Sequence, residues 1–301
     1  MTRIPVEHSV DHERVPDAPL VAPSANAGLL DVLRRRYVLK LLVRKEIQAR
    51  YSGSFLGLFW SYVQPAVKFC MYFFVVGIVL QLHKSVPVFG IHMFAGIVFV
   101  HYFTETFSAG TRSIVRNKAI IRKMAMPREM FPLASMLVSA FHVVPGLVIL
   151  TTACVFIGWA PDPAGILAGF MAFLIIALWG TALALLFSAA NVFFRDFSNI
   201  VSTLTTFVTF SVPMIYPYSA VASRFGAFAD VYLLNPIATA VLLAQRCFWV
   251  GATPHPEVTA AVDLPDHLFQ LGFAQIGAAL VALVVAQLVF SRLEPKFAER
   301  L

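Results

Sequence analysis

Long apolar runs recur along most of this 301-residue chain, and they restrict what it can fold into more than any other feature. A helix that crosses a bilayer needs about 20 consecutive, mostly apolar residues. We expect an all-α polytopic membrane protein, because helices satisfy their own backbone hydrogen bonds in lipid. The sequence contains six runs close to this length, at 56–82, 91–109, 131–157, 165–193, 200–216 and 271–290.

The composition excludes a water-soluble globular domain. Hydrophobic residues make up 59% of the chain and charged residues 13%, whereas an average soluble domain has about 25% charged residues. The three cysteines, Cys70, Cys154 and Cys247, lie far apart and imply neither a disulfide framework nor a metal site. The histidines show no metal-ligand spacing, so we expect no metal.

The Lys and Arg residues predict the orientation in the membrane. Most of the 23 basic residues precede the first run, follow the last, or lie in the second and fourth connections. The other connections hold only Lys84, Arg224 and Arg246. Because basic loops stay in the cytoplasm, we expect both termini there. The net charge of +7 is thus a topology signal and an attraction to anionic lipid head groups, and does not indicate a nucleic-acid partner.

The chain divides into four parts. Residues 1–28 are rich in Pro, Asp, Glu and His and lack a signal-peptide core, so we expect a disordered cytoplasmic tail. Residues 29–55 predict a basic amphipathic helix on the inner membrane surface with a linker, or alternatively an ordinary juxtamembrane positive cluster. Residues 56–291 form the expected six-helix transmembrane domain, and 292–301 the cytoplasmic C-terminus.

Two connections inside the transmembrane domain stand out. The segment after the second run is too charged for lipid, yet Ile114, Ile120 and Ile121 give it an apolar side. It predicts either a short cytoplasmic helix at about 113–123 that docks in a groove of a partner protein, or a simple hairpin connection. The proline-rich segment at about 217–269 predicts short re-entrant or surface helices on the outer side.

The first run carries the main candidate for function. Trp60, Gln64, Lys68 and Tyr72 follow one another at intervals of four, so they share one helix face. A lysine facing hydrocarbon costs several kcal/mol, which makes Lys68 a candidate to meet an anionic head group or a partner helix. The equally weighted alternative is a structural lysine paired with backbone carbonyls or reaching the interface.

The first two runs also concentrate aromatic residues, which offer a sugar chain flat apolar faces. For any single ring, a lipid-facing or interfacial position is the simpler reading. The candidate substrate pathway comprises Trp60, Tyr62, Gln64, Lys68, Phe69, Tyr72, Phe73, Phe99, Tyr102 and Phe103.

Catalytic chemistry is not indicated. A nucleophile with a neighbouring base is not apparent, so we expect a transport protein and not an enzyme. The phosphate-binding pattern GxxxxGK[ST] is also absent. ATP-driven work would therefore need a second polypeptide.

Several motifs resemble one family, in its order and over most of the chain. These are 44–65 (RKEIQARYSGSFLGLFWSYVQP), 117–133 (NKAIIRKMAMPREMFPL), Arg195-Asp196, 213–217 (PMIYP) and Asn235-Pro236. The chain is similar to the Wzm-type permease subunits of bacterial polysaccharide-exporting ABC transporters. It most resembles the mycobacterial members that export lipid-linked galactan for cell wall biogenesis.

The resemblance implies a homodimer in the bacterial cytoplasmic (inner) membrane, with a channel at the permease interface. It also implies two copies of a Wzt-type ATPase, which would bind ATP and Mg, so that this chain itself holds no cofactor. An N-terminal interface helix, outer gate helices and a coupling helix that contacts the ATPase are further implications. The implied coupling residues are Ser113, Ile114, Arg116, Asn117, Lys118, Ile120, Ile121, Arg122 and Lys123.

The resulting hypothesis is a channel-forming subunit of an exporter for a polyprenyl-diphosphate-linked polysaccharide. The basic residues Arg34, Arg35, Arg36, Arg44 and Arg50 would attract the lipid diphosphate. Alternative cargoes are teichoic acid, capsule or a drug. A membrane-embedded transferase, or a proton-coupled carrier that uses His101 and Glu105, are rivals from other classes.

Overall fold

Regular structure in the computed structural model is entirely helical across the residues it describes, 28–53, 57–124 and 126–300. This confirms the all-α fold expected from the apolar runs. The expected tail, apart from Gly28, lies outside the described residues. The longer helices are α2 (Arg36–Tyr51), α3 (Trp60–Tyr72), α4 (Phe89–Arg116), α6 (Met130–Ile157), α7 (Pro163–Phe193), α8 (Phe197–Phe210), α11 (Pro236–Phe248) and α13 (Leu268–Leu293).

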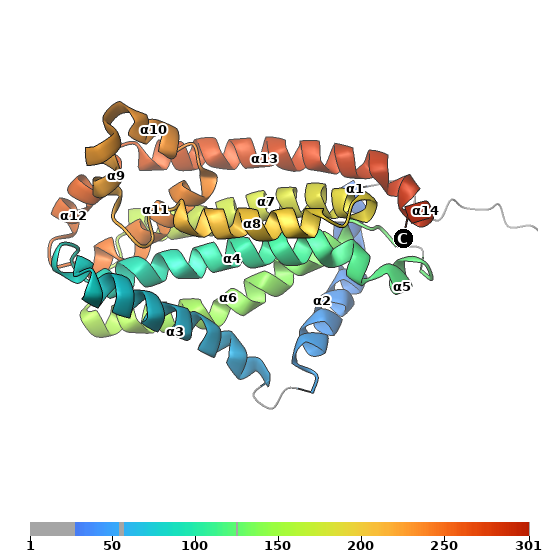
Figure 1. The fold of residues 1–301 in the computed structure, drawn as a ribbon, viewed down its shortest axis with the longest axis horizontal. Helices are drawn as coiled ribbons and strands as arrows, with labels where there is room; N and C mark the ends of the chain where they lie inside the picture. Colours follow the sequence, from blue (N-terminus) through green and yellow to red (C-terminus); the bar gives the residue numbers. More distant parts are fainter. Residues whose placement is uncertain (1–27, 54–56, 125, 301) are drawn as a thin grey trace, which may run out of the picture.

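The long helices lie roughly parallel in an elongated bundle (Figure 1). The short helices gather at its two ends. One end, here called the basic end, holds α1 (Gly28–Arg34), α5 (Lys118–Ile121) and α14 (Phe297–Arg300). The opposite end, here called the short-helix end, holds α9 (Tyr218–Phe225), α10 (Ala229–Tyr232) and α12 (Pro256–Asp263).

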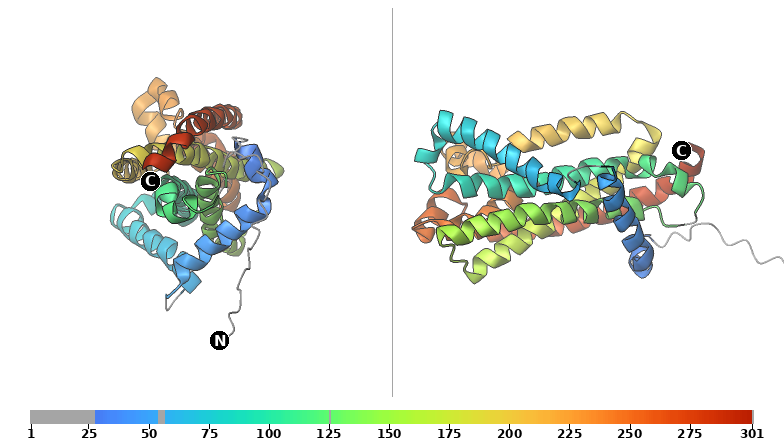
Figure 2. Two further views of the ribbon diagram at one scale, coloured as in Figure 1. Left: turned by 90° about the vertical axis from the view of Figure 1, so that its right-hand side faces the viewer. Right: turned by 90° about the horizontal axis from the view of Figure 1, so that it is seen from below.

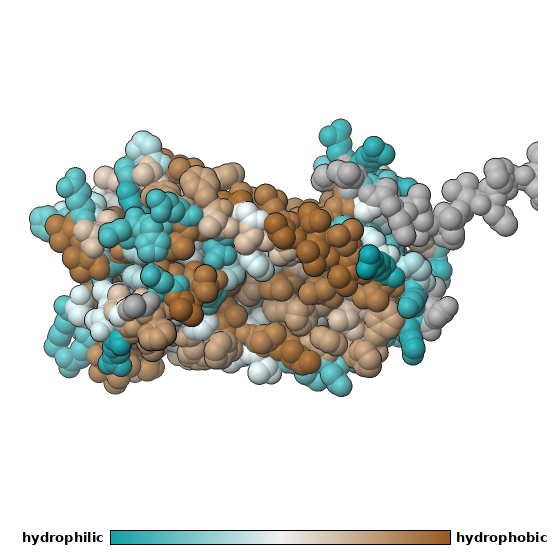
Figure 3. Space-filling view, turned by 90° about the horizontal axis from the view of Figure 1, so that it is seen from above, coloured by the Kyte–Doolittle hydropathy of each residue, from teal (hydrophilic) through white to brown (hydrophobic). Residues whose placement is uncertain are grey.

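The surface and the helix lengths agree with a membrane protein. On the face shown in Figure 3, apolar side chains form a broad band across the middle of the bundle, with polar side chains gathered toward both ends. By length and composition, 4 helices in the described part of the chain can cross a membrane. They are Trp60–Val79, in which a π-helix at Phe73–Val79 continues α3, together with Met130–Ile157, Pro163–Phe193 and Leu268–Lys296.

The other two expected spans differ from the sequence-based prediction. The run 91–109 lies within α4, a longer helix that is mostly buried inside the bundle. The run 200–216 corresponds to α8, which has 14 residues and ends before Pro213. At 1.5 Å per residue α8 is about 21 Å long, short of the roughly 30 Å hydrocarbon layer. Six crossings therefore remain a prediction.

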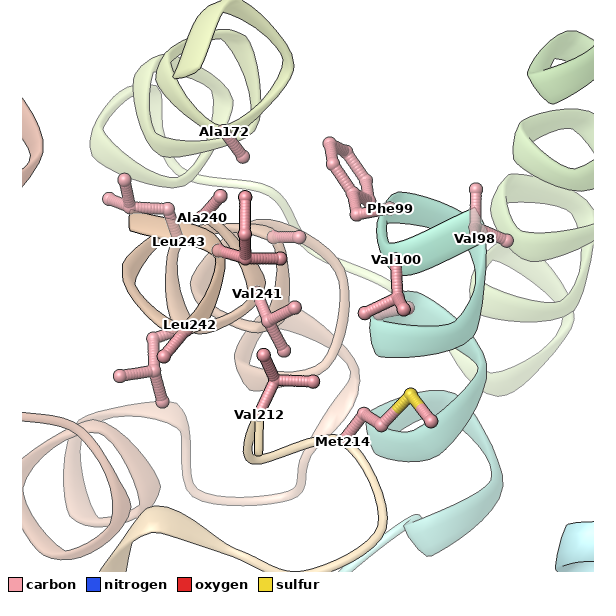
Figure 4. Close-up of a cluster of buried hydrophobic side chains, with 14 of the residues drawn as sticks. Val98, Phe99, Val100, Ala172, Val212, Met214, Ala240, Val241, Leu242 and Leu243 are labelled. Atoms are coloured by element: carbon pink, nitrogen blue, oxygen red, sulfur yellow. The ribbon is translucent and has the colours of Figure 1, made fainter. Parts of the chain in front are cut away.

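The main core surrounds α4. Phe99 and Val100 of α4 lie on the side of residues 240–243 of α11 and Ala172 of α7, whereas Val98 points to the other side of α4, toward α6 (Figure 4). Val212 and Met214, which follow α8, close the same cluster. Helix α11 is thus buried along most of its length, although it belongs to the segment expected to form short re-entrant or surface helices on the outer side. The remainder of that segment forms the short helices α9, α10 and α12.

A second core lies at the basic end. Here α2 crosses the bundle at a steep angle, as the two further views show (Figure 2). Leu39 and Leu42 of α2 are buried in a cluster with Ile114, Ile121 and Met130. The amphipathic segment expected to lie on the membrane surface thus packs its apolar face on α4, α5 and α6, with a break between α1 and α2 at Arg35.

Candidate functional site

The expected coupling segment is divided between two helices. Helix α4 continues to Arg116, Asn117 breaks it, and α5 covers only Lys118–Ile121. Ser113, Ile114, Asn117 and Ile121 are buried inside the chain, because α2 packs over this region. Their burial leaves little side-chain surface for a partner, and their part in coupling stays a prediction. The residues that remain at the surface are Arg116, Lys118, Arg122 and Lys123, with Ile120 half-buried.

The basic residues of the N-terminal helices separate into two groups. Arg34, Arg36 and Arg44 are exposed, and Arg35 pairs with Asp31 one turn earlier, with 3.1 Å from Nε to Oδ2. Arg50 differs, because its Nη1 donates a hydrogen bond to Glu105 Oε1 at 2.5 Å. The first group forms an exposed basic surface on α1 and α2, whereas Arg50 belongs to a polar junction between α2 and α4.

That junction extends to a neighbouring residue. The Tyr51 hydroxyl lies 2.5 Å from the hydroxyl of Ser61 on α3 and 3.0 Å from Nε2 of His142 on α6. The last turn of α2 is thereby joined to α3, α4 and α6 by polar contacts. The contact with Ser61 places the first turn of α3 beside the last turn of α2.

A cavity of about 480 Å³ lies between α2, α4 and α6 beside this junction. Its walls carry basic, acidic and small side chains. They are Lys45, Glu46, Ala49, Arg50, Glu105, Ala109, Arg112, Arg116, Asn117, Ser135 and Val138. Arg50, Arg116 and Asn117 of this set were candidates from the sequence, and Glu105 was named for the rival proton-coupled carrier. The others were missed, because they become neighbours only when α2 folds back across the bundle.

The expected substrate-pathway residues also fall into two groups. On α3 and its continuation, Trp60, Tyr62, Gln64 and Lys68 are exposed, whereas Phe69, Tyr72 and Phe73 are half-buried. The expected pathway residues of the second run are instead buried in the core, and their part in a substrate pathway stays a prediction. They are Phe99, Tyr102 and Phe103.

Packing of α4 explains this burial. The Tyr102 ring stacks on Phe173 of α7, and its hydroxyl lies 3.4 Å from the sulfur of Met136 on α6. The Phe103 ring packs against Phe107 one turn later. Since α4 is surrounded by α6, α7, α8 and α11, most of its rings face other helices of the same chain.

Lys68 faces a small polar cavity. The cavity measures about 40 Å³ and lies between α3, α4 and α8, with His101, Thr104 and Thr209 in its wall. Lys68 and Tyr72 line it from α3. The lysine thus faces polar groups of two neighbouring helices inside the apolar band.

Helix α8 has a row of polar side chains that the sequence analysis missed. Asn199, Ser202, Thr206 and Thr209 follow at intervals of three or four and so share one face. The first three are exposed, and Thr209 reaches the Lys68 cavity. Hydroxyls at helical spacing within an apolar run were a visible signal in the sequence. In the part of the chain that the structure describes, this row is covered by no other element.

The short-helix end contains a third polar feature. Arg246 of α11 donates two hydrogen bonds to Asp162, from Nη1 to Oδ1 at 2.9 Å and from Nη2 to Oδ2 at 2.7 Å. Asp162 also caps α7 by accepting a hydrogen bond from the Gly165 amide at 3.1 Å. The hydrogen bonds from Arg246 lower the pKa of the Asp162 carboxyl below its usual range. The pair borders a cavity of about 600 Å³ that His255 and Glu257 also line.

Within the described residues, no group of His, Cys, Asp and Glu side chains could hold a metal ion. The candidate features are a charged cavity at one end of the bundle, a polar row and a lysine among apolar helices, and a charged cavity at the other end. The apolar helices that carry them indicate an integral membrane protein.

Comparison with known proteins agrees with this class. The chain belongs to the ABC-2 type transporter family, whose pattern matches residues 37–247. It is 28% identical over 233 residues to the O-antigen export system permease protein RfbA of Myxococcus xanthus, which covers 77% of this chain and 88% of that protein. It is 21% identical over 262 residues to the protein of the same name from Klebsiella pneumoniae, covering 87% of this chain and 94% of that protein.

Proposed function

We propose that this chain is the channel-forming transmembrane subunit of an ATP-driven exporter for a polyprenyl-diphosphate-linked polysaccharide. Its membership of the ABC-2 type transporter family and its similarity to O-antigen export permeases support a polysaccharide cargo. Galactan for the cell wall is the cargo implied by the resemblance to the mycobacterial exporters. Teichoic acid, capsule or a drug are the alternatives that the experiment below separates.

The observation that carries the proposal is the polar row of α8. The hydroxyls of Thr206 and Thr209 donate hydrogen bonds to backbone carbonyls one turn earlier, whereas the side chains of Asn199 and Ser202 form no hydrogen bond within the described residues. Lipid offers exposed polar side chains no partner, so a helix face that meets only lipid gains nothing from this row. The row leads to Thr209 and the Lys68 cavity, so polar groups extend along much of α8. A hydrated sugar path beside this face satisfies those groups.

The same face supports a homodimer. Trp60, Tyr62 and Val67 of α3 are exposed, as are Phe207 and Phe210 of α8. A second copy packed against α3 and α8 would bury these apolar side chains and enclose the polar row. The channel would then run between the two copies, with the α3 aromatic side chains and Lys68 beside the sugar chain.

Energy would come from a separate Wzt-type ATPase, present in two copies, that binds ATP and Mg. The exposed basic side chains Arg116, Lys118, Arg122 and Lys123 form the proposed contact surface for it. The exposed residues Arg34, Arg36 and Arg44, with Arg35 beside them, would attract the lipid diphosphate to the same end. We place both chain ends in the cytoplasm, which is supported by α1 and α14 lying at one end of the bundle.

Co-expression with the candidate ATPase tests the proposal. Affinity purification through this chain should recover both polypeptides together, with ATP hydrolysis in the complex. Mass spectrometry of co-purified lipid should identify a polyprenyl-diphosphate-linked glycan and so name the cargo. Vigorous transport by this chain in liposomes without the ATPase and without nucleotide would contradict the proposal, and a matched preparation of the ATPase alone is the control.

A further inference from the structure

The cavity between α2, α4 and α6 is built from one face of each helix. On α4, Glu105, Ala109, Arg112 and Arg116 follow at intervals of four, three and four, and so lie in one row. On α2, the residues from Lys45 to Arg50 that line the cavity face this row, and Ser135 and Val138 of α6 contribute the third wall. Its volume of about 480 Å³ lies within the usual range for small-ligand sites.

Small side chains keep the cavity open. Ala49 on α2 and Ala109 on α4 stand where larger side chains would fill the space between the charged groups. From Glu105 to Arg116 the row on α4 extends about 16 Å along the helix axis. The cavity is therefore an elongated slot that begins at the basic end and is open to the surface along its exposed cations Lys45, Arg112 and Arg116.

The charges in the slot are unequal. It is lined by the four cations Lys45, Arg50, Arg112 and Arg116, against only two carboxylates, Glu46 and Glu105. Glu105 pairs with Arg50, and Glu46 pairs with Arg116 and accepts a hydrogen bond from Asn117 Nδ2 at 3.0 Å. Neither remaining cation forms an ion pair within the described residues, and Lys45 only reaches Asn117 Oδ1 at 3.4 Å.

We propose that this slot binds a diphosphate group, with Arg112 and Lys45 as its principal contacts and Arg50 and Arg116 as flanking cations. The site rests on the proposed function for its biological ligand, the diphosphate of the lipid-linked glycan. Guanidinium groups match phosphate oxygens in pairs, and two unpaired cations leave an excess positive charge that a diphosphate neutralises. The slot is also distinct from the exposed arginines of α1 and α2, which would only attract the anion to the surface.

A sugar or an acidic protein segment fits the slot less well. No aromatic ring lines it, so a sugar face has nothing to stack on. A protein segment would have to enter between three packed helices, whereas a phosphate group on a flexible chain can do so. Because Asn117 lies in the wall and precedes α5, an anion in the slot would contact α2 and the connection to α5 at once.

The test uses the full chain in nanodiscs of phosphatidylcholine, which adds no net lipid charge. Farnesyl diphosphate binding is measured by calorimetry, with farnesol and empty nanodiscs as references for partition into lipid. Competition by inorganic pyrophosphate distinguishes the two sources of the group. If farnesyl diphosphate binds more tightly than pyrophosphate, the ligand is a lipid-borne diphosphate. If the two bind equally, the ligand is a free diphosphate. Either result supports a diphosphate site in the slot.

Variants identify the slot. Arg112→Gln should weaken binding about tenfold, as expected for loss of one charge-assisted hydrogen bond, and Arg112→Lys should retain part of the affinity. Ala109→Leu fills the cavity without a change in charge and should abolish binding. Arg292→Gln, an equal charge change at an exposed position of α13, is the control and should bind as the wild type.

Equal binding by the wild type, Arg112→Gln and Ala109→Leu would overturn the site, provided that each variant elutes as the wild type does on size exclusion. This outcome would leave the proposed function intact, because export with the ATPase is measured separately. Conversely, diphosphate binding that depends on Arg112, in a chain that recruits no ATPase, would support the site and contradict the proposed exporter.

Discussion

Small residues decide how closely the central helix approaches its neighbours. At Gly110 of α4, an added Cβ would lie 2.4 Å from the Cβ of Ala184 on α7, which is closer than atoms can pack. Both backbones therefore meet at this point, and the two small residues allow it. Gly277 on α13 is the opposite case, with nothing within 4 Å of an added Cβ.

Gly110→Ala should therefore lower the thermal stability of the detergent-solubilised protein. Overpacking costs about 1–3 kcal/mol, and the helix propensity gained by replacing glycine is only about 1 kcal/mol. Gly277→Ala is the matched control and should leave the melting temperature unchanged or raise it slightly. The melting temperature is read by fluorescence-detected size exclusion after heating. An equal response of the two variants would contradict the close packing of α4 on α7.

Asp162 shows how one side chain serves two partners. It caps α7 and pairs with Arg246 of α11, so it fixes the relative position of two helices at the short-helix end. Because the pKa of Asp162 is lowered, its contribution to stability is fully present above the pKa of an unfolded aspartate, about 3.9. The contribution is lost as the pH falls through the lower pKa of the folded state.

Asp162→Ala should destabilise the protein at neutral pH by about 1 kcal/mol, the usual value for a lost helix cap. The difference in melting temperature from the wild type should stay constant between about pH 6 and 8 and shrink below about pH 4. Asp266→Ala removes an exposed carboxylate of the same end and is the control. If the difference in melting temperature between Asp162→Ala and the wild type grew as the pH falls, the lowered pKa of Asp162 would be contradicted.

At the scale of elements, α2 is the helix whose role differs most from the sequence-based expectation. Its apolar face packs on α4, α5 and α6, and its last turn is fixed by the Arg50–Glu105 pair. The side chains of this pair are 40% and 22% accessible, against 52% and 13% in the Arg116–Glu46 pair, so the two pairs that join α2 to α4 are similarly exposed. Water and salt therefore screen both pairs to a similar extent.

A double-mutant cycle should measure this. Arg50→Ala, Glu105→Ala and their combination are expected to give a coupling energy of up to about 1 kcal/mol, and the single variants should speed hydrogen exchange in α2. The same cycle on Arg116 and Glu46 should give a similar value, because the two pairs are similarly exposed. A coupling energy near zero in both cycles, with unchanged hydrogen exchange, would contradict a role of these pairs in holding α2.

At the scale of the whole molecule, the exposed face of α3 and α8 is the surface that a single copy of the chain leaves uncovered. It combines large apolar side chains with the polar row of α8, and in the described part of the chain no other element covers it. A face of this composition suits contact with another copy beside a hydrated path, since lipid would solvate only its apolar half.

Cysteine cross-linking tests the proposed dimer. Thr206→Cys in a Cys70→Ser background should give covalent dimers with bifunctional maleimides of graded length, because Thr206 would face its counterpart across the channel. Val284→Cys, 60% exposed before substitution on α13, is the control and should remain monomeric. Dimers that form through Val284→Cys and not through Thr206→Cys would place the interface on another face.

The sequence predicts those features of the fold and site that depend on consecutive residues, and not those that depend on contacts between distant helices. The expected runs 131–157, 165–193 and 271–290 coincide closely with α6, α7 and α13, because hydrophobic length is readable from consecutive residues. The burial of Phe99, Tyr102 and Ile114 could not be read in this way. A ring in lipid and a ring in a helix core have the same sequence signature, and only the neighbouring helices distinguish them.

The sequence by itself determined the all-helical fold, the apolar band and the concentration of basic residues, since these follow from the composition of contiguous segments. Only the tertiary structure decided that α11 enters the core and that Arg50 meets Glu105 across 55 positions of chain. It also decided that Arg112 and Lys45 share a slot. The physical reason is that helix packing, and not sequence spacing, determines which faces of distant helices meet.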